Sequence, residues 1–218
     1  MSKVGVLLSG SGFLDGAEIR ESVLTLLCLD QAGVEYEIFA PNITQYHVVN
    51  HLTGEAVDES RNVLVEAARI ARGNILDIKE VDPTSYSALF IPGGYGVAKN
   101  FSNFAFEGCS AEVEPNVKSF LYAYRELKRP IGGICISPAL ISLVYGDTGV
   151  SLTIGNDAQT AEQLELLGVK HIDCEVTKCI TDKENKIVTT AAYMYDSARL
   201  SEVFQGIESC VKATLELI

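Results

Sequence analysis

The residues with the clearest capacity for chemistry lie in the stretch GICISP, residues 133–138. An apolar run before Cys135 predicts a buried strand, and a second apolar run after it predicts a helix. Small side chains at Gly133 and Ser137 would permit the sharp turn of a nucleophile elbow, with cysteine in place of serine. Helix amides and the positive end of the helix dipole would face the sulfur and favour its thiolate. The alternative is a buried structural cysteine, because free cysteine is among the most buried residue types.

Two further groups could assist such a cysteine. Gly93 and Gly94 follow another predicted strand, and a glycine pair leaves backbone N–H groups free to face a ligand oxygen. If the two strands are neighbours, the amides of Gly94 and Ile136 would form an oxyanion hole; otherwise the glycines make an ordinary tight turn. Glu18 and Glu21 begin a predicted helix and share one face of it. Carboxylates are also common there for dipole reasons, so either one reaches Cys135 or both are solvated.

Histidine, the usual base beside a cysteine nucleophile, is scarce in this chain, which has only His47, His51 and His171. A Cys-His-acid triad would place a histidine after the last strand, near residues 191–193, and none is there. His51 lies in a polar stretch, 42–58, that predicts irregular structure. We expect His51 to be a loop residue, with lining of the site as the alternative, because functional groups concentrate on loops.

The composition is that of an ordinary globular chain with an acidic excess. Its 218 residues, 47% of them hydrophobic, predict one domain over residues 1–218. The 29 acidic and 17 basic residues give a net charge of −12, which argues against nucleic-acid and anionic-membrane partners. The six cysteines form no CxxC pair and no zinc-ligand spacing, so we expect no metal. Free thiols and the lack of a predicted targeting or membrane segment favour the cytoplasm.

Apolar strands alternate with amphipathic helices, which predicts an α/β fold with a mostly parallel sheet. Ligands of such sheets bind at the carboxyl ends of the strands, where the loops after residues 8, 91 and 134 would meet. The glycines of the loop over 10–16 miss the dinucleotide fingerprint, so nucleotide binding is not expected. We predict strands over 3–8, 35–40, 88–91 and 130–134, a hairpin of 175–180 with 186–190, and helices over 18–31, 59–72, 112–128, 139–144, 158–167 and 201–217.

Taken together, these residues resemble the PfpI superfamily, the class I glutamine amidotransferase-like proteins, and within it the ElbB-type glyoxalases. The resemblance extends over essentially the whole chain. It is carried by LSGSG at 8–12, DGAEI at 15–19, NHLTGE at 50–55, RNVL at 61–64, AARIARG at 67–73, PGGYGVAKN at 92–100, LTIG at 152–155 and KIVTT at 186–190.

The resemblance implies a flavodoxin-like three-layer sandwich in a single domain, and a homodimer. It implies that Cys135 is the reactive cysteine, that Glu21 rather than Glu18 hydrogen-bonds the thiolate, and that the amides of Gly94 and Ile136 are the oxyanion donors. Further residues that could line the site are Glu18, Gly93, His51 and Asn100. No histidine follows Cys135, and no late His-x-Glu is present, so protease and glutaminase activities are not expected.

The activity that the resemblance implies is a cofactor-independent glyoxalase, a lyase that converts glyoxal, and by extension methylglyoxal, to the 2-hydroxy acid. Cys135 would form a hemithioacetal with this small dicarbonyl substrate, and Glu21 would move the proton. The same thiolate could instead remove early glycation adducts as a deglycase. Two functions of other classes stay open: a redox sensor that oxidises Cys135, and an amidotransferase-like regulatory or accessory protein that has lost its triad.

Overall fold

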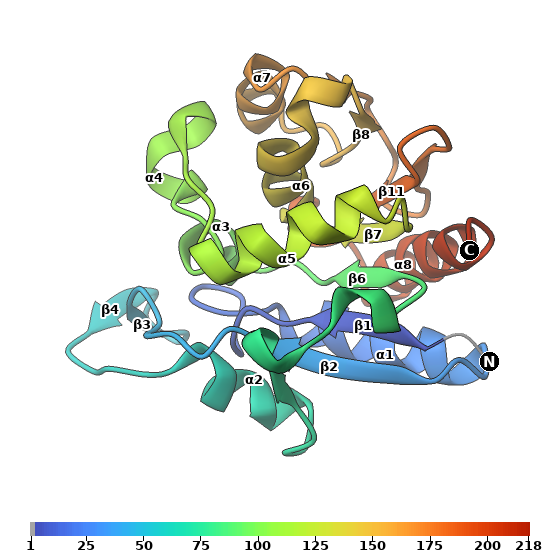
Figure 1. Cartoon of the computed structure of the whole chain (residues 1–218). Coiled ribbons are helices and arrows are strands. Elements are labelled where there is room, and N and C mark those ends of the chain that lie inside the picture. The colour runs from blue at the N-terminus through green and yellow to red at the C-terminus, as the bar shows by residue number, and fades with distance from the viewer. Residues whose placement is uncertain (1–2) are drawn as a thin grey trace.

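The main sheet is assembled from short strands, most of which are apolar, and helices in the connections between them cover its faces. The computed structural model describes residues 3–218, and within them seven strands pair in the order β10-β11-β7-β6-β1-β2-β5 (Figure 1). Every pair in this sheet is parallel except β10 with β11. The strands are β1 Val4–Leu7, β2 Tyr36–Ala40, β5 Leu76–Asp77, β6 Leu89–Ile91, β7 Ile131–Ile134, β10 Ile180–Asp182 and β11 Ile187–Thr190.

Helices cover both faces of the sheet. Adjacent residues of a strand point to opposite faces. A Cβ on Gly132 of β7 would meet Thr214 of α8, and a Cβ on Gly133 would meet Ile141 of α6, so α8 and α6 lie on opposite faces. Helix α1 packs beside α8, and α5 beside α6 (Figure 1). The helices are α1 Ile19–Gln31, α2 Val63–Ile70, α3 Tyr95–Lys99, α4 Phe104–Glu107, α5 Pro115–Glu126, α6 Ser137–Tyr145, α7 Ala158–Leu166 and α8 Leu200–Leu215.

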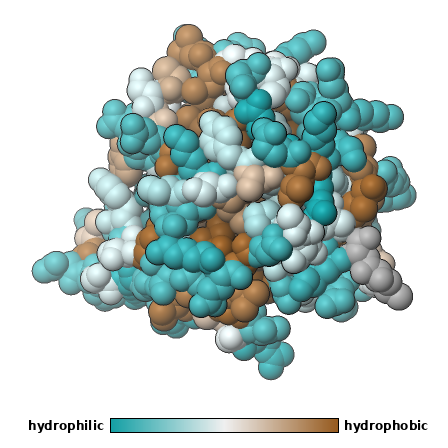
Figure 2. Space-filling view, viewed as in Figure 1, coloured by the Kyte–Doolittle hydropathy of each residue, from teal (hydrophilic) through white to brown (hydrophobic). Residues whose placement is uncertain are grey.

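The flavodoxin-like three-layer sandwich expected from the sequence is therefore confirmed. Strands buried on both faces read as continuous apolar runs, and β1, β6, β7 and β11 are buried along their whole length. The surface is more polar than this interior: Figure 2 shows hydrophilic residues across the viewed face, with hydrophobic ones between them. Within residues 3–218, no helix is both long and apolar enough to cross a membrane.

Two helices begin later than predicted because a polar side chain caps each one. Helix α2 begins at Val63, since the Oδ1 atom of Asn62 accepts a hydrogen bond from the Val65 amide at 3.1 Å. Helix α5 begins at Pro115, with the Glu114 carboxylate accepting from two amides of its first turn. Proline suits the first helical position, where its missing N–H has no partner to lose.

Two predictions at the strand level were wrong. The stretch over 42–58, expected to be irregular, contains an antiparallel hairpin of β3 Val48–Asn50 and β4 Glu55–Val57. The strand predicted over 175–180 is instead β10 Ile180–Asp182, which pairs with β11 across a turn at 183–186. A separate parallel pair joins β8 Ser151–Leu152 to β9 Lys170–His171. Local polarity hid the first hairpin, because β4 is exposed and its side chains do not alternate.

Candidate active site

Cys135 occupies a sharp turn between β7 and α6. Its φ of 60° lies in the left-handed region, which is costly for a residue with a Cβ and is a feature of nucleophile elbows. The turn is held from both sides. The Cys135 amide donates to the Thr190 carbonyl at 2.9 Å, and the Ser137 hydroxyl donates to the Pro92 carbonyl at 3.1 Å. These contacts tie the turn to the ends of β11 and β6, the strands on either side of β7.

Two backbone amides face the sulfur. The amides of Gly94 and Ile136 both hydrogen-bond to the Cys135 thiol and lower its pKa. Gly94 follows β6, which pairs directly with β7. The strands before Gly94 and Cys135 are therefore neighbours, and the turns that contain these two residues meet. Gly94 has a φ of 95°, and a Cβ there would lie 2.4 Å from the Glu18 nitrogen and the Gly16 carbonyl oxygen. Only glycine brings this amide to the sulfur without displacing the loop after β1.

The carboxyl group of Glu21 is buried beside Cys135. Glu21 is 0% exposed, and its two oxygens accept hydrogen bonds from the amides of Gly93 at 2.9 Å and Tyr193 at 3.2 Å. It also hydrogen-bonds with the thiol of Cys135. One side chain from α1 therefore joins the ends of β6, β7 and β11. Strand β6 lies between β1, which precedes α1, and β7, so Glu21 reaches the elbow across one intervening strand.

The protonation of this pair is governed by burial. Burial, and after it the charge of Glu18, raise the pKa of the Glu21 carboxyl to about 8, so Glu21 carries a proton at neutral pH. Burial also raises the pKa of the Cys135 thiol well above its ordinary value, and a charge on Glu21 would add to this. The expected lowering of the thiol pKa by the helix dipole is therefore outweighed by burial, and a Cys135 thiolate requires a Glu21 carboxyl that keeps its proton and donates a hydrogen bond to the sulfur.

Glu18 has a different position from Glu21. It is the N-cap of α1, where its Oε2 atom accepts a hydrogen bond from the Glu21 amide at 2.6 Å. Its side chain is half-buried, and burial raises the pKa of its carboxyl. Glu18 therefore acts on the sulfur through Glu21. It caps the first turn of the helix that carries Glu21, and its charge raises the pKa of the Glu21 carboxyl.

Asn100 and His51 were the other candidates for lining the site, and their hydrogen bonds go to other parts of the molecule. The Asn100 amide group donates to the carbonyls of Ser9 and Asp15, each at 2.9 Å, and its oxygen accepts from the Tyr46 amide at 2.9 Å. These three bonds saturate the side chain with backbone, so Asn100 positions loops. His51 is exposed at the turn of the β3–β4 hairpin, with its Nε2 atom 3.3 Å from the Leu14 nitrogen.

The sequence argument missed the role of Tyr193. Residues 191–193 were inspected for a histidine side chain, but the group that reaches Glu21 from there is the backbone amide of Tyr193. The Tyr193 hydroxyl also accepts from Arg20 of α1 at 3.1 Å. Ala192, with a φ of 42°, makes the turn that presents this amide. The residue type at position 193 does not predict this role, because every residue except proline carries a backbone N–H donor.

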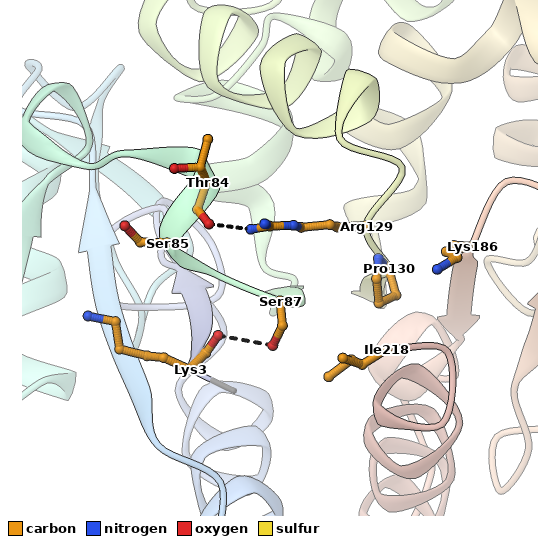
Figure 3. Close-up of a pocket in the computed structure, with 8 residues that line it drawn as sticks. All are labelled: Lys3, Thr84, Ser85, Ser87, Arg129, Pro130, Lys186 and Ile218. Atoms are coloured by element: carbon orange, nitrogen blue, oxygen red, sulfur yellow. Dashed lines mark hydrogen bonds between the residues drawn. The ribbon is translucent and has the colours of Figure 1, made fainter. Parts of the chain in front are cut away.

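A separate cavity of about 370 Å³ lies at the other end of the sheet (Figure 3). Its lining includes Lys3, Pro130 and Lys186, which directly precede β1, β7 and β11. The Arg129 guanidinium donates to the Thr84 carbonyl at 2.6 Å, shown as a dashed line. This cavity faces the amino ends of the strands and takes no part in the Cys135 site. Among residues 3–218, no cluster of three or more His, Cys, Asp or Glu side chains could hold a metal ion.

No family model matches the chain. A human protein named glutamine amidotransferase-like class 1 domain-containing protein 3, mitochondrial, is 40% identical over 99% of this chain and 83% of its own length. A crystal structure of an isoprenoid biosynthesis protein with an amidotransferase-like domain from Ehrlichia chaffeensis is 40% identical, with a TM-score of 0.94, over 100% of this chain and 99% of that one.

A DJ-1 superfamily protein from Agrobacterium tumefaciens shares the fold at 18% identity, with a TM-score of 0.55 over 99% of this chain and 89% of that one. The relatives also correct the expected cytoplasmic location. The human protein and relatives from rat and zebrafish are all named mitochondrial. Free cysteines indicate only a reducing compartment, and they do not say which one.

Proposed function

Because this chain belongs to the family of the glutamine amidotransferase-like class 1 and ES1 proteins, within the DJ-1/ThiJ/PfpI superfamily, we propose that it is a cofactor-independent glyoxalase. The resemblance to the PfpI superfamily expected from the sequence is confirmed by this membership. Some members of the superfamily are cysteine-nucleophile enzymes. The substrate class we propose is a small dicarbonyl, glyoxal first and methylglyoxal second.

One observation carries the proposal: a protonated, buried carboxyl touches a cysteine that two amides also face. Glu21 supplies a proton that can move, and the amides of Gly94 and Ile136 supply fixed donors. Amide hydrolysis would further require an acid to protonate a departing amine, and an aldehyde has no such leaving group. A site with one movable proton therefore suits addition to a carbonyl followed by proton transfer between carbons.

The reaction begins with the Cys135 thiolate attacking one aldehyde carbon of glyoxal. The new C–S bond pushes the carbonyl electrons onto oxygen, where the amides of Gly94 and Ile136 stabilise the charge. Glu21 then gives its proton to this oxygen and forms a hemithioacetal. The resulting Glu21 carboxylate is now charged in a buried site, which makes it a strong base for the next step.

Glu21 next removes the hydrogen on the hemithioacetal carbon, and the electrons move to the second carbonyl as an enediolate. Glu21 returns this proton to the second carbon, and the proton of the first hydroxyl passes to the second oxygen, which leaves the thioester of glycolate. Glu21 is again a carboxylate and takes a proton from water, whose oxygen attacks the thioester and expels the Cys135 thiolate. The sum is glyoxal and water to glycolate and one proton, and both side chains return to their starting states.

The proposal is tested by measuring glyoxal consumption together with glycolate formation. We expect wild-type protein to form one glycolate per glyoxal consumed, and Cys135→Ser to form none above background. Cys109→Ser is the matched control, because Cys109 is a free thiol outside the elbow and its loss should leave turnover intact. Glyoxal loss without glycolate would indicate adduct formation or deglycation in place of the glyoxalase reaction. Equal turnover in Cys135→Ser would contradict the assignment of the nucleophile.

The expected homodimer is part of the same proposal. On α1, the apolar side chains of Ile19, Val23 and Leu27 are exposed and lie four residues apart, so they form one stripe along the helix. We infer that a second copy of the chain covers this stripe. The stripe faces away from the sheet, whereas Glu21 on the same helix points into the site, so a dimer through α1 would support the helix that positions the proton donor.

A further inference from the structure

A group of exposed aromatic rings lies at the carboxyl end of the sheet, outside the elbow, and Lys99 lies against one of them, Tyr95. The four rings keep roughly half of their surface exposed: Phe13 45%, Tyr46 59%, Tyr95 49% and Phe106 48%. They come from the loop after β1, the segment before β3, the start of α3 and α4. Large exposed rings gathered from four separate segments mark a binding surface more often than scattered single ones do.

Direct contacts make these rings one continuous surface. The rings of Tyr46 and Phe106 pack with centroids 4.5 Å apart, and the Tyr46 and His47 rings lie 5.2 Å apart. The Tyr95 amide donates to the Phe13 carbonyl at 2.8 Å, which places those two residues side by side. The Lys99 ammonium lies 4.8 Å from the centre of the Tyr95 ring, and 3.2 Å from His47, so it joins the two halves.

Lys99 is a half-buried cation without an ion-pair partner among residues 3–218. Its Nζ atom donates to the Leu14 carbonyl at 2.9 Å and lies 3.2 Å from Nε2 of His47. Burial lowers the pKa of His47, so its imidazole is neutral and accepts that bond at neutral pH. An ammonium has three donors, which leaves one for a ligand. Neither partner cancels the charge.

The nearby carboxylate of Asp15 is already occupied. Its Oδ2 atom accepts from the Val49 amide at 2.7 Å, and its Oδ1 atom faces His51 Nε2 at 3.7 Å. Burial lowers the pKa of Lys99, and the charge of Asp15 opposes this lowering only in part. The chain has a net charge of −12, so a cation beside exposed rings is unusual for its surface. An organic anion could pair with the Lys99 ammonium. Because the negative charge of Asp15 is nearby, a ligand with one negative charge is favoured over a ligand with two.

This surface adjoins the proposed oxyanion donors. Gly94 is the N-cap of α3 and Lys99 is its last residue, so α3 spans about 7.5 Å between them at 1.5 Å per residue. We propose that Lys99, with the rings of Tyr95 and Tyr46, binds the carboxylate and planar body of a substrate whose carbonyl carbon reacts at Cys135. The inference rests on the proposed function, and among dicarbonyl substrates it favours those that carry a carboxylate over uncharged ones such as glyoxal.

The test separates binding from turnover by using ketones that the proposed reaction does not consume. Calorimetric titration of wild-type protein with 4-acetylbenzoate and with its neutral counterpart acetophenone should show at least about ten-fold tighter binding of the anion. Lys99→Met should abolish this preference, and Lys99→Arg should retain most of it because the cation remains. Lys118→Met is the matched control, since Lys118 is exposed on α5, and it should leave the preference unchanged.

Turnover gives the second arm. The ratio of kcat/KM for 4-carboxyphenylglyoxal over phenylglyoxal should fall at least about ten-fold in Lys99→Met and not in Lys118→Met. Equal binding of the two ketones by wild-type protein, or a preference that survives in Lys99→Met, would overturn the inference. A preference in binding without any glyoxal turnover would sink the proposed function while leaving the carboxylate site in place. Thermal unfolding of Lys99→Met must match wild type closely enough to exclude a collapsed loop.

Discussion

At the scale of single residues, Glu21 is the group whose chemistry departs furthest from that of its free side chain. Its carboxyl has no contact with water, and it accepts from two backbone amides while it faces a thiol. A glutamine could not repeat this arrangement, because its NH2 group would face one of the two amide donors. Glu21→Gln is therefore both a chemical and a structural change, and its effects must be read at several pH values.

The raised pKa of Glu21 predicts how stability depends on pH. The folded protein keeps this proton up to about pH 8, whereas the unfolded chain releases it near the ordinary glutamate pKa of 4.5. The folded state thus binds more protons between these values, and its stability falls as pH rises through them. In Glu21→Gln this decline should shrink by an amount on the order of a few kcal/mol. Urea unfolding at pH 5, 7 and 9 measures it.

The control for that series is Glu126→Gln, since Glu126 is exposed at the end of α5. Its unfolding free energy should follow the wild-type curve at every pH. If the unfolding free energies of wild type and Glu21→Gln change with pH in the same way, Glu21 is ionised in the folded protein. The proposed reaction, which starts from a protonated Glu21, would then be wrong.

Activity should distinguish the two glutamates of α1. Glu21→Gln removes the movable proton, and kcat for glyoxal should fall by roughly two orders of magnitude or more. Glu18→Gln keeps an oxygen to accept from the Glu21 amide, and we expect a loss of less than about ten-fold. Steady-state kinetics of both variants decide between them. An inactive Glu18→Gln variant together with an active Glu21→Gln variant would show that Glu18, and not Glu21, transfers the proton.

At the scale of elements, the turn between β6 and α3 is the most constrained connection of the site. Gly94 combines a φ of 95° with backbone atoms 2.4 Å from where a Cβ would lie. Gly94→Ala should destabilise the fold by about 2 to 4 kcal/mol and displace the amide from the sulfur, so turnover should be lost as well. Urea unfolding and glyoxal turnover measure the two effects.

Gly73 provides the matched control, because its φ of 82° is also left-handed and no heavy atom lies within 4 Å of a Cβ there. Gly73→Ala should cost about 1 kcal/mol and leave turnover unchanged. If the two substitutions lower the free energy of unfolding equally, the left-handed backbone conformation alone explains why position 94 requires glycine. The close approach of the loop after β1 would then not contribute to that requirement.

At the scale of the whole molecule, the α1 stripe predicts how the chain assembles. Val23→Lys would place a charge in the middle of a contact between two copies, and burying an unpaired ammonium is unfavourable. Light scattering after gel filtration should therefore show a dimer for wild type and a monomer for Val23→Lys. Val65→Lys, at an exposed apolar position of α2, should remain a dimer. A wild-type monomer at micromolar concentration would contradict the dimer itself.

Much of the architecture was predictable from the chain, because strands buried on both faces and helices with one apolar face leave local patterns. The runs around β1, β6 and β7 and the helix α1 all lie where those patterns predicted. The late starts of α2 and α5 were missed, since Asn62 and Glu114 end one conformation and cap the next. The β3–β4 hairpin escaped because its exposed strand carries no apolar alternation.

The sequence by itself determined that Cys135 and Gly94 each stand at a turn after a strand, because a turn is specified by a few adjacent residues, and its resemblance to the PfpI superfamily implied Glu21 rather than Glu18 as the partner of the thiolate. Only the tertiary structure decided that the two turns meet, since β6 pairs with β7, and that the Tyr193 amide holds the Glu21 carboxyl beside the sulfur. It also decided that burial, more than the helix dipole, sets the pKa of both partners. Burial and hydrogen bonding across 172 residues depend on how distant segments pack, and no local pattern records that.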